Sequence, residues 1–171
     1  MKININGQTI KQQINAELKY HIRDPSFNEI LPNIYVGNYA FALNKKLLQE
    51  NKITHILNCG IHLVNLFQKE NNFKYLNIPL YDFEYQELED YVNKTNKFIE
   101  EGSTNGNKIL IHCGEGVSRS VSICLMYMII IKKLTFTEAF NIMNQKRPCS
   151  KPNEGFIKQL KQQSMDIYNK V

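Results

Sequence analysis

The stretch KILIHCGEGVSRSVSICLMYMIII, residues 108–131, holds an apolar run, a short glycine-containing loop and a second apolar segment. The first run ends at Cys113 and is typical of a strand in the centre of a sheet that is covered on both faces. From Arg119 onward nearly every residue is apolar, which predicts a helix buried in the core. In an open α/β sheet, ligands bind where such a strand passes through a loop into the next helix.

The segments on either side alternate between strand-like and helix-like patterns. Apolar runs that end at turn residues predict three further strands, at residues 33–37, 53–59 and 73–80. Apolar residues at helical spacing predict helices at residues 40–51, 86–101, 135–147 and 155–168. The third of these begins with a capping box, Thr135 followed by Glu138. We therefore predict an α/β fold with a central, mostly parallel sheet of four to five strands, flanked by helices on both faces.

The length of 171 residues suits one domain with its own core, and no repeat or flexible linker divides the chain. Residues 1–26 are predicted to be an N-terminal extension, with a short strand at 3–5 and a polar helix at 11–23. The sequence Asp-Pro-Ser at residues 24–26 ends this extension. Residues 27–171 are predicted to form the globular domain.

Charge and cysteine content exclude several classes of protein. The net charge of +5 is scattered, whereas a nucleic-acid binder concentrates it, so no nucleic-acid partner is expected. The segment 121–131 is shorter than the roughly 20 residues that span a bilayer, so no membrane insertion is expected. The chain has four cysteines, which have neither zinc-site spacing nor the density of a disulfide framework: Cys59, Cys113, Cys124 and Cys149. No signal peptide opens the sequence. We expect reduced thiols, a cytoplasmic or nuclear location and no metal.

The place of Cys113 between strand and loop predicts a reactive thiol. The loop consists of Gly114, Glu115, Gly116, Val117 and Ser118, and its N–H groups together with the following helix dipole can bind an anion. A cysteine in such a field ionises more readily than a free thiol, so we expect a thiolate at neutral pH. Arg119 adds a planar fork of donors for two oxygens of a tetrahedral oxyanion. Together these groups describe a phosphoryl-transfer site that works through a cysteinyl-phosphate.

The same residues resemble a known signature. His112-Cys113, five residues, then Arg119-Ser120 is similar to the signature loop of the Cys-based protein tyrosine phosphatases, and HCGEGVSRS resembles the dual specificity branch. The similarity continues in ILPNIYVGNYAFA, KITHILNC and KRPCSKPNEGFIKQL, and covers about residues 29–163. The resemblance implies a small, atypical member whose dual specificity phosphatase catalytic domain spans residues 27–171.

The resemblance also implies roles for single residues. A leaving alkoxide needs a proton donor, and the family places an Asp just after the third strand, some 30 residues before the cysteine. Asp82 lies 31 residues before Cys113 and is preferred to Glu84. Supporting roles follow for three further residues. They are Ser120, as a hydroxyl that donates to the thiolate, His112, as a buried residue that holds the loop, and Asn153, as a brace for the loop.

We therefore expect a phosphatase of phosphotyrosine and phosphoserine/phosphothreonine in a phosphorylated protein, a kinase among the candidates, with no cofactor. Its cleft should be shallow, because the chain has little room for deep walls. One alternative is a phosphatase of a non-protein phosphomonoester, a phosphoinositide or an RNA 5′-phosphate, which Glu115 in the loop disfavours. Another is a phospho-binding scaffold, which the presence of Cys113, Arg119 and Asp82 disfavours. Cys59 is a candidate partner for an oxidised Cys113. The sequence predicts no oligomeric state.

Overall fold

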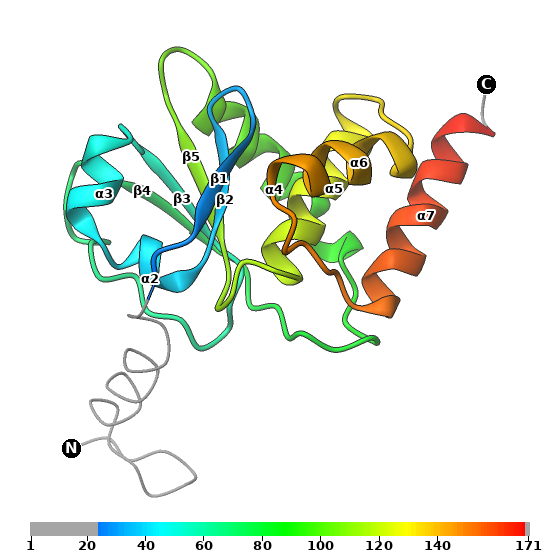
Figure 1. The fold of residues 1–171 in the computed structure, drawn as a ribbon, viewed down its shortest axis with the longest axis horizontal. Coiled ribbons are helices and arrows are strands. Elements are labelled where there is room, and N and C mark those ends of the chain that lie inside the picture. The colour runs from blue at the N-terminus through cyan, green and yellow to red at the C-terminus, as the bar shows by residue number, and fades with distance from the viewer. Residues whose placement is uncertain (1–23, 170–171) are drawn as a thin grey trace, which may run out of the picture.

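The computed structural model describes residues 24–169 and contains a five-stranded sheet with helices on both faces (Figure 1). The strand order is β1-β2-β5-β3-β4. Strands β2, β5, β3 and β4 are parallel, and β1 pairs with β2 in the antiparallel direction. The strands are β1 Phe27–Leu31, β2 Ile34–Gly37, β3 His55–Asn58, β4 Lys74–Asn77 and β5 Ile109–His112. The predicted mostly parallel sheet of four to five strands is confirmed.

The helices form two layers because side chains along each strand alternate between the two faces of the sheet. Leu110 of β5 packs with α2 and α3 on one face, whereas Ile109 and Ile111 join the larger cluster beneath α4, α5, α6 and α7. The helices are α2 Tyr39–Ala42, α3 Lys45–Glu50, α4 Glu89–Ser103, α5 Arg119–Ile130, α6 Phe136–Lys146 and α7 Glu154–Tyr168.

The strand and helix that carry the signature lie at the centre of the domain. Every residue of β5 is buried, between β2 and β3, and α5 is buried from Ser120 to Ile129. Within residues 24–169, no helix combines the length and apolar character needed to cross a membrane. The apolar segment 121–131 is therefore core, and the strand before it presents Cys113 at the carboxyl edge of the sheet.

Several local predictions need correction. The predicted helix at residues 40–51 is two helices, α2 and α3, because the side chain of Asn44 accepts a hydrogen bond from Leu47 N at 3.1 Å and caps α3. Strand β1 was not predicted. Helix α4 begins at Glu89 and not at residue 86. The strand and helix predicted at residues 3–5 and 11–23 lie outside the described residues.

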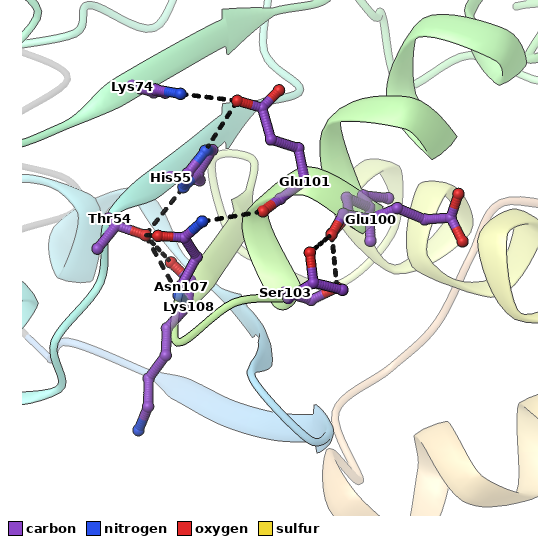
Figure 2. A network of polar contacts seen from close by, with 10 residues as sticks. Thr54, His55, Lys74, Glu100, Glu101, Ser103, Asn107 and Lys108 are labelled. Atoms are coloured by element: carbon purple, nitrogen blue, oxygen red, sulfur yellow. Dashed lines mark hydrogen bonds and ion pairs between the residues drawn. The ribbon is translucent and has the colours of Figure 1, made fainter.

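The amino ends of β3 and β4 are joined to α4 by a polar network around His55 (Figure 2). His55 is buried, its Nδ1 lies 2.8 Å from Thr54 Oγ1, and its Nε2 lies 3.6 Å from the carboxylate of Glu101. Lys74 Nζ contacts the same carboxylate at 2.7 Å. Burial lowers the pKa of His55, and Glu101 opposes part of that effect. The network ties the end of α4 to the starts of β3 and β4, at the edge of the sheet opposite Cys113.

Candidate active site

A cavity of about 470 Å³ opens at the carboxyl end of β5. Four residues that the sequence nominated for catalysis or support line it: Cys113, Arg119, Asp82 and Asn153. Of the predicted phosphate-binding loop, Glu115, Val117 and Ser118 also line the cavity. The lining residues come from the β5–α5 loop, the segment after β4 and the start of α7, so three parts of the chain that are distant in sequence meet at this cavity.

The thiol of Cys113 lines this cavity and contacts two hydrogen-bonding groups. The backbone N–H of Gly116 donates to Sγ at 3.2 Å, and Ser120 Oγ lies 3.3 Å from Sγ. Cys113 is only 1% exposed, and Ser120 is fully buried beneath it. The N–H of Gly116 can only donate, and the hydroxyl of Ser120 is able to donate, so both groups can stabilise a negative sulfur.

Arg119 lines the cavity and has one unsatisfied donor. Its side chain is one-fifth exposed, and Nη1 lies 3.5 Å from the carbonyl oxygen of Leu80. Its buried Nε has no hydrogen-bond partner among residues 24–169 and lies 3.9 Å from a carboxylate oxygen of Asp82. A buried guanidinium N–H without an acceptor is costly, so the site is suited to an anion that supplies the missing acceptor.

Asp82 is held against the signature loop by two neutral donors. Its Oδ1 accepts hydrogen bonds from Ser118 Oγ at 2.6 Å and from Asn153 Nδ2 at 2.9 Å. The backbone N–H of Asn153 donates to Ser118 Oγ at 3.2 Å, which closes the triangle. Asn153 therefore contacts both the loop and the acid. Glu84 lines the same cavity but has neither of these contacts to Ser118 and Asn153.

Arg147 supports the loop from behind and was not singled out from the sequence. It is 1% exposed, and its Nε donates to the carbonyl oxygen of Gly116 at 2.7 Å. Nη1 donates to Asn28 Oδ1 at 2.8 Å and to Ser26 Oγ at 3.2 Å. Gly116 itself has φ of +68°, and a Cβ there would lie 2.5 Å from the carbonyl oxygen of Gly37. Only glycine suits this position.

His112 holds the other side of the loop. Its ring is buried and stacked on Tyr39 with a centroid distance of 5.9 Å, and Tyr39 N donates to the carbonyl oxygen of Gly114 at 2.9 Å. Burial, with a smaller contribution from Arg119, lowers the pKa of His112 to about 4, so the ring is neutral at physiological pH. Cys59 N donates to the His112 carbonyl at 2.8 Å, and burial raises the pKa of the Cys59 thiol well above its ordinary value.

Comparisons with known proteins agree with this geometry. The family model of the dual specificity phosphatase catalytic domain matches residues 34–165. A Dictyostelium discoideum protein named "Probable dual specificity protein phosphatase" is 38% identical over 136 residues, which are 78% of this chain but 33% of that protein. Human dual specificity protein phosphatase 22 is 35% identical over 135 residues, 79% of this chain and 72% of the relative.

Among solved structures, the human tyrosine phosphatase-like serine/threonine/tyrosine-interacting protein superposes with a TM-score of 0.74 at 31% identity. That superposition covers 84% of this chain and 97% of the other. The fold and the signature define a Cys-based phosphatase domain of the protein tyrosine phosphatase type. The chain belongs to the dual specificity phosphatase family, as the sequence resemblance predicted.

Proposed function

We propose that this chain is a protein phosphatase that hydrolyses phosphotyrosine and phosphoserine/phosphothreonine through a cysteinyl-phosphate intermediate. The observation that carries the proposal is the convergence of complementary groups in one cavity. They are a sulfur that accepts a hydrogen bond from the Gly116 N–H and contacts the Ser120 hydroxyl, a guanidinium with an unsatisfied N–H, and a carboxyl group. The substrate is a phosphorylated protein of the cytoplasm or nucleus, which is consistent with the four free thiols.

In the first step, the loop N–H groups and Arg119 bind the terminal phosphate oxygens, and Cys113 Sγ attacks phosphorus. The bond between phosphorus and the leaving oxygen breaks as Asp82 donates its proton to that oxygen. Because Oδ1 of Asp82 already accepts two hydrogen bonds, Oδ2 is the oxygen that carries the proton. The alkoxide or phenoxide then leaves as a neutral alcohol or phenol.

In the second step, water attacks the phosphorus of the cysteinyl-phosphate while Asp82, now a carboxylate, accepts a proton from it. The phosphorus–sulfur bond breaks, and inorganic phosphate and the thiolate form. The hydroxyl of Ser120, 3.3 Å from Sγ, donates to the departing sulfur and lowers the barrier of this step. The positive field needed in both steps comes from backbone N–H groups and Arg119.

The charge around the cavity favours a protein over a phosphoinositide or an RNA 5′-phosphate. Apart from Arg119, the cationic side chain in the lining is Lys151, whereas the acidic ones are Asp82, Glu84, Glu115 and Glu154. A substrate with several phosphates would meet this excess of carboxylates at close range. A single phosphate on a peptide enters the pocket alone, so the negative lining opposes it less.

Turnover of four substrates tests the proposal: p-nitrophenyl phosphate, a phosphotyrosine peptide, a phosphothreonine peptide and a phosphoinositide. We expect hydrolysis of the first three, no activity in Cys113→Ser, and a loss of about 10²–10⁴ with the peptides in Asp82→Asn. Cys149→Ser, at an exposed cysteine outside the cavity, is the matched control and should retain activity. An inert wild type would leave the scaffold alternative, and faster turnover of the phosphoinositide would overturn the protein assignment.

A further inference from the structure

The segment that carries Asp82 is anchored by a distant helix. We call residues 81–88, between β4 and α4, the acid loop. Figure 1 shows this green segment passing close to the orange start of α7. Contacts join the two at both ends of the acid loop: Asn153 holds Asp82 at the first end, and Gln159 holds the last residues before α4.

Gln159 binds the backbone of the acid loop with both atoms of its side-chain amide. Its Oε1 accepts from Leu88 N at 2.9 Å, and its Nε2 donates to the carbonyl oxygen of Gln86 at 2.9 Å. Leu88 is fully buried, and Gln159 Oε1 is the acceptor that the described structure gives its N–H, so loss of Gln159 would leave a buried donor without this partner. Because one atom of the amide accepts and the other donates, Gln159 binds both a backbone N–H and a backbone carbonyl of the acid loop.

The middle of the acid loop also lies directly on α7. A Cβ added to Gly155 would lie 1.8 Å from the carbonyl oxygen of Glu84, so the two backbones approach as closely as glycine permits. Gly155 and Gln159 are four residues apart and share one side of the helix. Asn153 caps this helix, since its Oδ1 accepts from Phe156 N at 2.9 Å, while its Nδ2 holds Asp82. One side of α7 therefore follows the acid loop along most of its length.

The outward side chains of the acid loop provide little anchoring of their own. Tyr81, Phe83 and Tyr85 are 42%, 48% and 79% exposed, and they stack on one another with centroid distances of 5.7 and 5.4 Å. Because these large side chains remain largely in solvent, their burial contributes little to the position of the middle of the loop. Besides the buried Leu88 and the bond from Ser118 to Asp82, the contacts with α7 hold the loop in place.

We propose that Gln159 is a positioning residue for the general acid, holding the acid loop so that Asp82 faces the leaving oxygen. This inference rests on the proposed function, in which Asp82 donates the proton. A displacement of about 1 Å can lower a rate about 10²-fold. Loss of Gln159 should affect a step that requires proton transfer to the leaving group, and spare one that does not.

The test compares two small substrates that differ in the basicity of the leaving group. Phenyl phosphate releases a phenoxide whose conjugate acid has a pKa of about 10 and which needs a proton. The phenolate of 2,4-dinitrophenyl phosphate leaves without one. Because Asp82 also serves as base in the second step, which both esters share, the comparison uses kcat/KM, which reports only the steps up to the cysteinyl-phosphate. We expect Gln159→Ala to lower kcat/KM for phenyl phosphate about ten- to hundredfold, and kcat/KM for the dinitrophenyl ester less than about threefold. Activity on the second ester also shows that the variant is folded.

Two further variants sharpen the result. Gln162→Ala removes an exposed glutamine of the same helix that bonds only to Asp166 in the described structure, and should change neither rate. Gln159→Glu retains the acceptor for Leu88 N but loses the donor to Gln86, so its loss on phenyl phosphate should be intermediate.

The outcomes separate the inference from the function on which it rests. If Asp82→Asn shows the selective loss on phenyl phosphate but Gln159→Ala lowers both rates equally, or neither, the positioning role is refuted and the proposed function stands. If Asp82→Asn itself shows no selectivity between the esters, the assignment of the acid fails and the role of Gln159 fails with it.

Discussion

Replacement of the buried Arg147 by methionine should damage both stability and catalysis. Methionine fills a similar apolar volume but removes the donors that bind Gly116 O and Asn28 Oδ1 at 2.7 and 2.8 Å. Each hydrogen bond to a charged group contributes about 1.5–3 kcal/mol, so the two shortest bonds together contribute about 3–6 kcal/mol. Burial lowers the pKa of Arg147, which means that desolvation opposes the charged form. Replacing the charged side chain removes this desolvation cost, which offsets part of the free energy lost with the two hydrogen bonds.

We therefore expect the free energy of unfolding to fall by about 3 kcal/mol, a large share of the 5–15 kcal/mol typical of a domain. Urea unfolding followed by circular dichroism measures it. Because Arg147 holds the carbonyl of Gly116 and the N–H of Gly116 donates to the sulfur of Cys113, the proposed nucleophile, kcat/KM for p-nitrophenyl phosphate should also fall at least about tenfold. Lys146→Met, at the exposed neighbouring position, should change stability by less than about 0.5 kcal/mol. An Arg147→Met variant within about 1 kcal/mol of wild type, with unchanged kcat/KM, would refute the reasoning.

Three further predictions concern the signature loop. Gly116→Ala should lower kcat for p-nitrophenyl phosphate by about 10², because its φ is +68° and its Cβ would meet the Gly37 carbonyl at 2.5 Å; steady-state kinetics measures it. His112, whose pKa is lowered to about 4 from 6.5, stays neutral in the fold while the unfolded chain takes up the proton, so stability falls by about 3 kcal/mol between pH 6.5 and 4. Urea midpoints against pH should show a shallower dependence in His112→Asn than in wild type or in the exposed control His62→Asn. Ser120→Ala should slow hydrolysis of the cysteinyl-phosphate, and a stopped-flow burst of p-nitrophenol near one equivalent is expected; its absence contradicts the assigned role.

Local patterns predicted the buried central strand, and missed one short edge strand and the break between two helices. The apolar run before Cys113 indicated a central strand, because a strand covered on both faces has few polar positions. Strand β1 lies at the edge of the sheet, and its alternation in FNEIL is too short to stand out. The break between α2 and α3 had a local signal in Asn44, since asparagine side chains compete with helical hydrogen bonds.

The candidate site divides in the same way. Cys113, Arg119 and Ser120 lie within eight residues, so their spacing in the sequence alone predicted that they share one site. Asp82 required the spacing typical of a family, and its contacts to Ser118 and Asn153 join three separate segments. No local pattern marks Arg147 as buried. The acceptors of its guanidinium come from residues 26, 28, 115 and 116, which lie side by side only after the chain has folded.

The reach of this arginine to Ser26 and Asn28 has a practical consequence for the design of fragments. Similarity to the family model starts at residue 34, and a truncation chosen from it would remove both oxygen acceptors together with strand β1. Such a fragment would keep every residue of the signature yet leave part of a buried cation without acceptors, so we expect its signature loop to be misassembled. The smallest piece that preserves the loop must begin upstream of Ser26.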